Sequence, residues 1–230
     1  MISDYIIMVD FSHGINTLGK CSPDKRLKEW EYSRDIGWRL IDALKAVGFD
    51  ARPVVTEDYD VRINYTEYKR YDKTMGDTPW EGVKPVKSRV LRVNEVCRDN
   101  TDRKVVLVSV HCNAAGGDGQ WHDARGFSVF CSKKASTNSK RLAECFYRYA
   151  KDNSLLGNRS VPSPDGNGYH YWTWSWTKND IGILTETLCP AVLTENFFQD
   201  NKGDVEFMLS EQGKKAIVDM HVNAILEYIK

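Results

Sequence analysis

Hydrophobic residues along the chain form five short continuous runs, which are separated by polar stretches that contain glycine. The runs are rich in β-branched residues. Continuous apolar runs of this length are typical of strands buried on both faces of a parallel sheet. We therefore predict strands at Tyr5–Val9, Pro53–Val55, Val105–Val110, Phe127–Cys131 and Pro190–Thr194.

Other segments carry hydrophobic residues at intervals of three or four positions, the spacing of an amphipathic helix. The first runs from Glu29 to Val47 and precedes Gly48, the residue type that often ends a helix. A second helix is predicted over Ser139–Lys151, and a third after Ser210, whose hydroxyl suits an N-cap. Strands that alternate with helices predict an α/β fold, with a mostly parallel twisted sheet flanked by helices, in a single domain over residues 1–230.

The segment Glu57–Lys87 follows neither pattern. It is rich in Tyr, Lys, Asp and Thr, and it contains Pro79 and Pro85. Because such a composition has no continuous face to bury, we predict a surface insertion that faces the substrate.

Composition narrows the class of protein. The chain of 230 residues is 41% hydrophobic and 28% charged, which is typical of a globular protein. Its 32 basic and 32 acidic residues cancel, so no net charge favours a nucleic acid partner.

No apolar stretch approaches the roughly 20 residues that cross a bilayer, and we expect a monomer without a membrane partner. No secretion signal precedes the first predicted strand, which favours release of a phage type or export with the leader absent.

Six cysteines are dispersed along the chain without a C-x-x-C pair, and several lie inside apolar runs. Thiols in such positions behave as small hydrophobic groups, so we expect reduced cysteines.

Side chains with acid–base or ligand chemistry gather at one edge of the predicted sheet. His13 follows the first strand, while His111 and Glu195 each directly follow a later one. Glu29 opens the helix that returns from this edge, so its carboxylate can reach the same point. Loops at the carboxyl ends of parallel strands converge, and two histidines with one glutamate match the ligands of hydrolytic zinc sites. The sequence therefore predicts a metal site here.

Each of these residues also has a structural interpretation. A histidine after a buried strand can serve only as a hydrogen-bonding group, and a glutamate in the first turn of a helix interacts favourably with the helix dipole. Glu195 lies between an apolar strand and two phenylalanines, where a carboxylate is costly without a partner. The other histidines lack the edge placement: His221 is expected to be structural, and His122 and His170 lie in predicted loops.

Five blocks of sequence together resemble the ordered blocks of the type-3 zinc amidases, a family of N-acetylmuramoyl-L-alanine amidases. The blocks are Asp10–Gly14, Glu29–Ser33, Arg89–Asn94, Ser109–Ala114 and Ala191–Phe197, and they span nearly the whole chain. The resemblance implies that His13, Glu29 and His111 bind Zn²⁺. It also implies that Glu195 is catalytic, and that the substrate is bacterial peptidoglycan, cut at the amide bond between N-acetylmuramic acid and L-alanine.

The pattern departs from the family in two places. Gly14 is followed by Ile15 and Asn16, where the family usually has a second glycine and an acidic residue, so the loop geometry is expected to differ. Glu31 competes with Glu29 as a ligand, although on a helix the two would point about 200° apart. The distance from Glu29 to Gly48 resembles the length of the corresponding helix in the family, which favours Glu29. By resemblance alone, Asn113 is expected to orient a ligand or the substrate.

In the implied mechanism, zinc acts as a Lewis acid while Glu195 accepts a proton from water and passes it to the leaving nitrogen. An aromatic segment with alternating tryptophans offers either packing or a platform for sugar rings and the peptide: Trp172, Trp174 and Trp176. Two other functions remain open. One is a non-catalytic peptidoglycan-binding module of the same fold, and the other is a zinc peptidase that cuts within the stem peptide.

Overall fold

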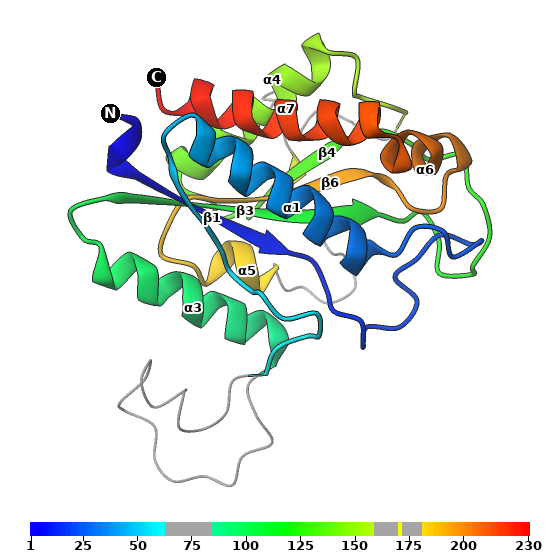
Figure 1. Ribbon diagram of the computed structural model, residues 1–230, viewed down its shortest axis with the longest axis horizontal. Helices are drawn as coiled ribbons and strands as arrows, with labels where there is room; N and C mark the ends of the chain where they lie inside the picture. The colour runs from blue at the N-terminus through cyan, green and yellow to red at the C-terminus, as the bar shows by residue number, and fades with distance from the viewer. Residues whose placement is uncertain (63–83, 159–169, 172–180) are drawn as a thin grey trace, which may run out of the picture.

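The computed structural model describes residues 1–62, 84–158, 170–171 and 181–230. Its strands are β1 (Tyr5–Phe11), β2 (Asp50–Pro53), β3 (Lys104–Asn113), β4 (Ser128–Cys131), β5 (His170–Tyr171) and β6 (Ala191–Phe198). They form one sheet in the order β2-β1-β3-β6-β4-β5 (Figure 1). The first four of these are mutually parallel, β4 runs antiparallel to β6, and β5 is parallel to β4. The prediction of a mostly parallel sheet is confirmed.

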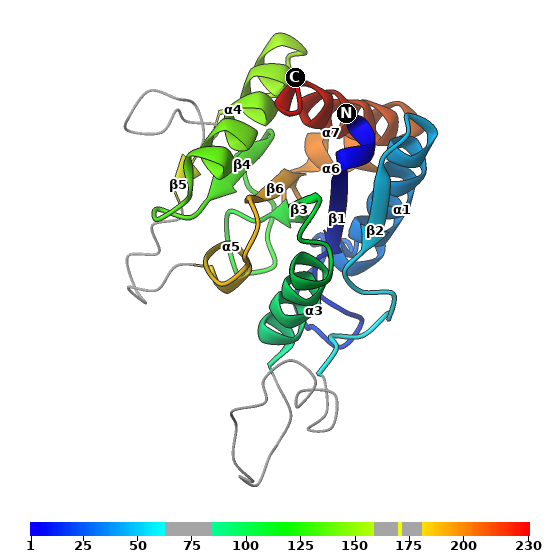
Figure 2. The same ribbon diagram turned by 90° about the vertical axis from the view of Figure 1, so that its left-hand side faces the viewer.

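Helices cover both faces of this sheet. One face carries α1 (Glu29–Ala46), α4 (Thr137–Asp152), α6 (Lys202–Leu209) and α7 (Glu211–Tyr228). The opposite face carries α3 (Pro85–Asp99) and α5 (Gly182–Thr185), as the two views in Figures 1 and 2 show. A short 3₁₀ helix, Ile2–Asp4, precedes β1. The three-layer arrangement is that of an α/β domain, as the alternation of elements predicts.

Helix α1 packs closely on β1. Its buried stripe includes Ile36, Leu40 and Leu44, which repeat at helical spacing and are fully buried. Burial of each such side chain contributes roughly 1.5–3 kcal/mol. At Gly37 a β-carbon would lie 2.1 Å from the ring of Phe11, so glycine permits this close approach. The first turn of α1 is thereby held at the carboxyl edge of the sheet.

The predicted helix ends agree closely with the structure. Gly48 has φ +99° directly after the C-cap of α1, a conformation that favours glycine. The side chain of Ser136 caps α4, which begins at Thr137, two residues before the predicted start, and the side chain of Ser210 caps α7 as expected. Because these caps act locally, the sequence is sufficient to locate them.

Two strands run further than predicted. His111 lies within β3 and Glu195 within β6, rather than directly after each strand. The backbones of β3 and β6 keep pairing through the His111–Glu195 register, and the pairing becomes irregular only between His111 and Asn113. The backbone pairing therefore extends both strands past their apolar runs, so that they include polar residues such as His111 and Glu195.

The position predicted for the second strand is wrong by a few residues. β2 is Asp50–Pro53, and its register pairs Val9 with Pro53. Val54 and Val55 are buried but lie beyond the strand. Buried residues therefore continue past the last residue of β2 that pairs with β1. An apolar run does not by itself show where a strand begins.

Helix α3 is absent from the elements that the sequence predicts. Its buried residues include Ser88, Arg89 and Asn94 beside three aliphatic ones, so the buried stripe does not read as a hydrophobic pattern. Its first residue, Pro85, suits the N-terminal turn, where the missing N–H has no helical partner.

The predicted insertion Glu57–Lys87 falls largely outside the described residues, since 63–83 are not described, and for that part it stays a prediction. Its ends belong to the fold: Val61 is buried, and Pro85 begins α3. Trp172, Trp174 and Trp176 also lie outside the described residues.

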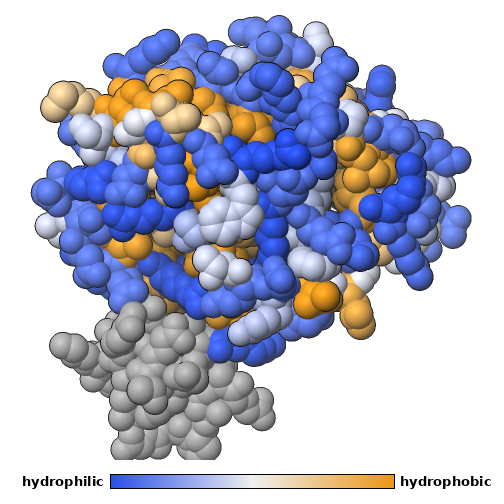
Figure 3. Space-filling view, in the orientation of Figure 1, coloured by the Kyte–Doolittle hydropathy of each residue, from blue (hydrophilic) through white to orange (hydrophobic). Residues whose placement is uncertain are grey.

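The face of the molecule shown in Figure 3 is largely hydrophilic, with separate hydrophobic areas. The large exposed hydrophobic residues include Leu18, Trp38 and Leu188, which lie on different elements. No helix in the described segments is both long and apolar enough to span a bilayer. All six cysteines are free thiols in this structure, as expected.

Candidate metal centre

The carboxyl ends of β1 and β3 bring three potential ligands together. His13 lies two residues beyond β1, His111 lies near the end of β3, and Glu29 is the first residue of α1. In Figure 1 the arrowheads of β1 and β3 point toward the end of the molecule at which α1 begins. The convergence therefore follows from the topology of a parallel sheet.

The ligand atoms are close to one another. Glu29 Oε1 lies 3.1 Å from His111 Nδ1, and Glu29 Oε2 lies 3.5 Å from His13 Nε2. One ligand atom from each of the three residues can be chosen so that all lie within 4.8 Å of one another. Two ligands of a tetrahedral zinc ion, each about 2.0–2.1 Å from it, lie about 3.4 Å apart, so these separations suit such an ion.

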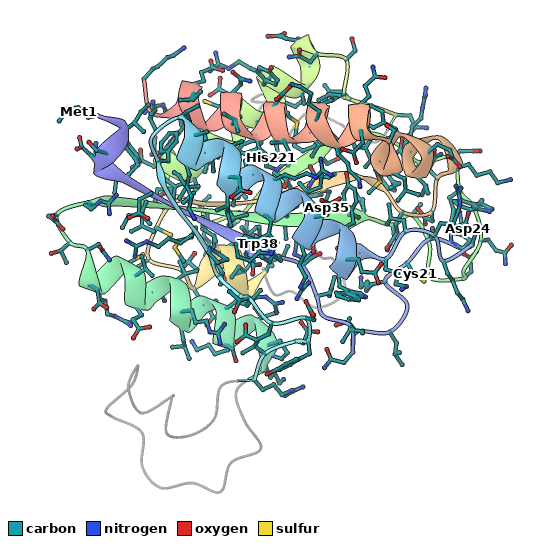
Figure 4. The ribbon with its side chains drawn as sticks, in the orientation of Figure 1. Met1, Cys21, Asp24, Asp35, Trp38 and His221 are labelled. Carbon is teal, nitrogen blue, oxygen red and sulfur yellow. The ribbon has the colours of Figure 1, made fainter. Side chains whose placement is uncertain are left out.

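Hydrogen bonds hold both the carboxylate and the backbone of Glu29. Its side chain is 1% exposed, and Oε1 accepts a hydrogen bond from the Cys112 backbone N–H at 3.1 Å. Its own backbone N–H donates to the carbonyl of Lys20 at 2.9 Å, which ties the start of α1 to the loop that follows β1. Cys21 and Asp24, labelled in Figure 4, mark this loop.

His13 has an unusual backbone conformation, with φ +49°. A non-glycine residue with positive φ persists only where its surroundings hold it, and such residues cluster at functional sites. The His13 carbonyl accepts hydrogen bonds from Nη2 of Arg34 at 3.1 Å and from Nη2 of Arg89 at 3.2 Å. The next residue, Gly14, has room for no β-carbon, which would lie 2.1 Å from the Asp60 nitrogen. Two arginines and one close backbone contact therefore fix the orientation of His13.

Arg89 connects this loop to the sheet. It is 5% exposed and donates to Asp10 Oδ1 at 3.0 Å and to Asp60 Oδ1 at 3.1 Å. The other oxygen of Asp10 accepts from the Ser109 hydroxyl at 2.7 Å. A buried guanidinium with two carboxylate partners is well compensated, whereas loss of one member leaves a buried charge unpaired. This network joins α3, β1 and β3 beneath His13.

The charges of the three potential ligands are coupled. Burial would raise the pKa of Glu29, but the hydrogen bond and charge of His111 outweigh it and lower that pKa to about 2. Burial opposes protonation of His111, yet the hydrogen bond and charge of Glu29 raise its pKa. Burial lowers the pKa of His13 to about 4, so its imidazole is neutral near pH 7. An ionised carboxylate and a neutral imidazole are metal-binding forms.

The residues fit a metal ion in a further respect. Glu29 Oε2 is buried and has no hydrogen-bond partner among the described residues. A buried carboxylate oxygen without a partner is costly, and a cation between it and the two imidazoles would satisfy it. The donor set, two imidazole nitrogens and one carboxylate, is that of hydrolytic zinc sites.

Glu195 lies beside this cluster on the neighbouring strand. It pairs with His111 in the parallel register of β3 and β6, so both side chains point to the same face of the sheet. Glu195 is 8% exposed, and its Oε2 has no hydrogen-bond partner in the described part of the chain. Burial raises the pKa of Glu195 to about 8, against the opposing charge of His111. A buried carboxyl group with no structural partner, next to a potential metal centre, suits a role in proton transfer.

The remaining candidates lie elsewhere. Glu31 is exposed and forms an ion pair with Lys28, so Glu29 and not Glu31 faces the histidines. His122 is paired with Asp118 in a loop, and the side chain of His170 is not described. Asn113 Oδ1 accepts from the Ala114 backbone N–H at 2.8 Å, which places its amide in the turn after β3.

His221 is structural, as expected. It is fully buried on α7, labelled in Figure 4, with Nδ1 2.8 Å from the carbonyl of Ile217 and Nε2 3.0 Å from Oγ1 of Thr194. The sequence interpretation missed the roles of Arg34, Asp10 and Asp60. Arg89 itself opens the block Arg89–Asn94, which resembles the amidase family. Its partners Asp10 and Asp60 are distant in sequence, so the block alone does not reveal them.

One cavity borders the cluster, and a second cavity is lined by neither the three potential ligands nor Glu195. One, of about 400 Å³, is lined by His13 and His111 together with apolar residues such as Val86 and Ile183. The other, of about 340 Å³, lies between the loop around Lys20 and the glycine-rich turn after β3. The first of these cavities leaves His13 and His111 accessible to a substrate.

The sequence matches one family over most of its length. The family described as N-acetylmuramoyl-L-alanine amidase matches residues 7–227. An endolysin of Bacillus phage SPP1 is 23% identical over 137 residues, which are 60% of this chain and 45% of the phage protein. This chain thus matches less than half the length of that curated relative.

Solved structures share the fold. The crystal structure of an N-acetylmuramoyl-L-alanine amidase from Clostridium difficile 630 superposes with TM-score 0.68 at 22% identity, covering 98% of this chain and 96% of that one. The amidase Ami1 from Mycobacterium smegmatis superposes with TM-score 0.72 at 17% identity, covering 99% and 98%.

Fold and site together define an α/β protein with a two-histidine, one-carboxylate centre at the carboxyl edge of its sheet. With the match over residues 7–227, the chain belongs to the N-acetylmuramoyl-L-alanine amidase family.

Proposed function

We propose that this chain hydrolyses the amide bond between N-acetylmuramic acid and L-alanine in bacterial peptidoglycan, with Zn²⁺ as its cofactor. The observation that carries the proposal is the cluster of His13, Glu29 and His111, whose ligand atoms lie within 4.8 Å of one another. Beside it lies the buried Glu195, whose Oε2 has no hydrogen-bond partner among the described residues. Family membership supplies the substrate class.

His13, Glu29 and His111 would hold the metal. When bound, zinc supplies a Lewis acid that polarises the scissile carbonyl and increases the acidity of water. The Cys112 backbone N–H and the two arginines on the His13 carbonyl would orient the ligands. Such outer contacts typically change metal affinity or activity by 10–100-fold when they are removed.

Glu195 would move the proton. In its ionised form it accepts a proton from the attacking water, and in its protonated form it donates that proton to the departing L-alanine nitrogen. Neither step competes with an existing interaction, because no hydrogen bond within the described residues occupies its Oε2. Its position beside His111 places it next to the ligand cluster.

The cavity lined by His13 and His111 would receive the part of the substrate next to the amide. All four proposed residues come from one chain, so a single chain holds a complete centre, and we propose that the monomer is the active form.

The test is digestion of purified peptidoglycan followed by mass spectrometry. We expect stem peptides with a free L-alanine N-terminus, together with glycan strands that lack peptides. Shortened peptides still attached to muramic acid would instead identify a peptidase, and binding without any product would identify a binding module. Metal analysis of the same preparation should give about one zinc per chain.

A further inference from the structure

A second cluster lies at the opposite end of the sheet from the metal centre. A cavity of about 370 Å³ is lined by residues at the starts of three strands, among them Tyr5, Lys104 and Pro190. Cys97 of α3 and Cys189, two residues before β6, line the same cavity. Both are partly buried free thiols.

Hydrogen bonds of Asn94 hold helix α3, which carries Cys97, against the segment that carries Cys189. The Asn94 amide donates to the carbonyl of Glu186 at 2.9 Å and accepts from the backbone N–H of Leu188 at 2.8 Å. Cys97 lies one helical turn beyond Asn94, and Cys189 directly follows Leu188. The same clamp that docks α3 onto this loop therefore places one cysteine against the other.

The surroundings of the two thiols differ. They are within hydrogen-bonding reach of each other, and this contact lowers the pKa of Cys97 while it raises that of Cys189 well above its usual range. Cys97 also lies beside the charge of Arg98, which favours its thiolate. Because the thiolate is the nucleophile, Cys97 is suited to react first and Cys189 to resolve.

We propose that Cys97 and Cys189 are a redox-active pair that forms a disulfide between α3 and the segment leading into β6 when the protein meets a low-molecular-weight disulfide such as oxidised glutathione. The Cys97 thiolate attacks one sulfur of the oxidant, which breaks its S–S bond and releases one glutathione thiolate. The Cys189 thiolate then attacks the sulfur of Cys97, which releases the second glutathione. Two thiol protons and two electrons leave the protein, and one oxidised glutathione becomes two reduced molecules.

The other cysteines differ from this pair. Cys112, Cys131 and Cys145 are at most 5% exposed and belong to the hydrophobic core. Cys21 lies in the loop after β1, where its backbone pairs with Lys28 in an isolated bridge. None of these four lines the cavity that Cys97 and Cys189 share.

The bond would link two elements that each contribute a residue beside the candidate metal centre. Helix α3 supplies Arg89, which holds the His13 carbonyl, and β6 supplies Glu195. It would join positions about 90 residues apart in sequence, and a cross-link over so long a loop strongly restricts the unfolded chain.

The test is oxidation of the full-length protein in a glutathione buffer, followed by thiol titration under denaturing conditions and non-reducing peptide mapping. We expect reaction to consume two of the six thiols and to link the peptides that contain Cys97 and Cys189. The melting temperature should rise by roughly 5–10 °C and return to its initial value in dithiothreitol. The readout is independent of hydrolytic activity.

Cys97→Ser and Cys189→Ser should each abolish the link and the rise in melting temperature, while Cys21→Ser should retain both. The melting temperature of each oxidised variant is compared with that of the same variant in its reduced form, which also shows whether the variant folds. Six titratable thiols after oxidation, glutathione attached to Cys97 without a cross-link, or a link to a different cysteine would each overturn the proposal.

Discussion

The backbone carbonyl of His13 accepts a hydrogen bond from Nη2 of Arg89 at 3.2 Å, across 76 positions of sequence. His13 has φ +49°, and the same carbonyl also accepts from Arg34. The orientation of the proposed ligand His13 thus depends on a side chain of α3, which covers the face of the sheet opposite α1. Arg89 is in this sense a positioning residue.

Replacement of Arg89 by Lys should weaken zinc binding by about 10–100-fold, because an ammonium cannot donate to Asp10, Asp60 and the His13 carbonyl at once. The free energy of unfolding should fall by about 1–3 kcal/mol. Competition with a zinc chelator and denaturant titration measure the two effects. Arg39→Lys is the matched control, since Arg39 forms exposed ion pairs, and it should change neither quantity appreciably. Zinc affinity equal to that of the control would contradict the positioning role.

Glu29→Gln and His111→Ala should each leave the protein with far less than one zinc per chain. The glutamine retains the shape of Glu29 but supplies a neutral amide, and the alanine removes an imidazole outright. Metal analysis after exhaustive dialysis checks this. His122→Ala, in an exposed loop pair with Asp118, serves as the control and should keep its zinc. Stoichiometric zinc in the His111 variant would show that the ligand set is wrong.

Glu195→Gln should reduce hydrolysis of peptidoglycan by about 10²–10⁴-fold, because the amide cannot accept a proton from water. Zinc content and melting temperature should stay close to those of the original protein, since the side chain is not among the three clustered ligands and makes no described hydrogen bond through Oε2. Release of zinc together with a lower melting temperature would identify Glu195 as a ligand instead. Turnover within tenfold of the original would remove it from the mechanism.

His221 should make folding stability depend on pH below about 6.5. Burial lowers its pKa to about 4 in the folded protein, whereas the unfolded chain binds the proton near the ordinary value of 6.5. The unfolded state therefore holds more protons between these pH values. The contribution of neutral His221 is complete above pH 6.5 and is lost as pH falls toward 4, by about 3 kcal/mol in total.

Denaturant titrations of the original protein and of His221→Gln at several pH values test this. The variant should lose less stability between pH 6.5 and 4, because its amide does not titrate. His122→Gln is the control, since His122 is partly exposed and the hydrogen bond with Asp118 raises its pKa. Parallel curves for the original protein and the His221 variant across this range would show that His221 does not take up the proton on unfolding.

The sequence alone determined the parts of the protein that depend on local pattern. Apolar runs predicted the central strands, helical spacing and Gly48 predicted α1, and Ser210 predicted the cap of α7. The order of strands then placed His13 and His111 at one edge, because parallel strands end on the same side of a sheet. These inferences need only the near neighbours of each residue.

Tertiary structure decided the features whose partners are distant in sequence. Helix α3 was missed because its buried face includes Arg89 and Asn94, whose hydrogen-bond partners lie on other elements. The ends of β3 and β6 depended on each other's backbones rather than on their own apolar residues. The positive φ of His13 likewise depends on two arginines from two different helices. A polar group can be buried only where a partner meets it, and the sequence does not show which distant residue that partner is.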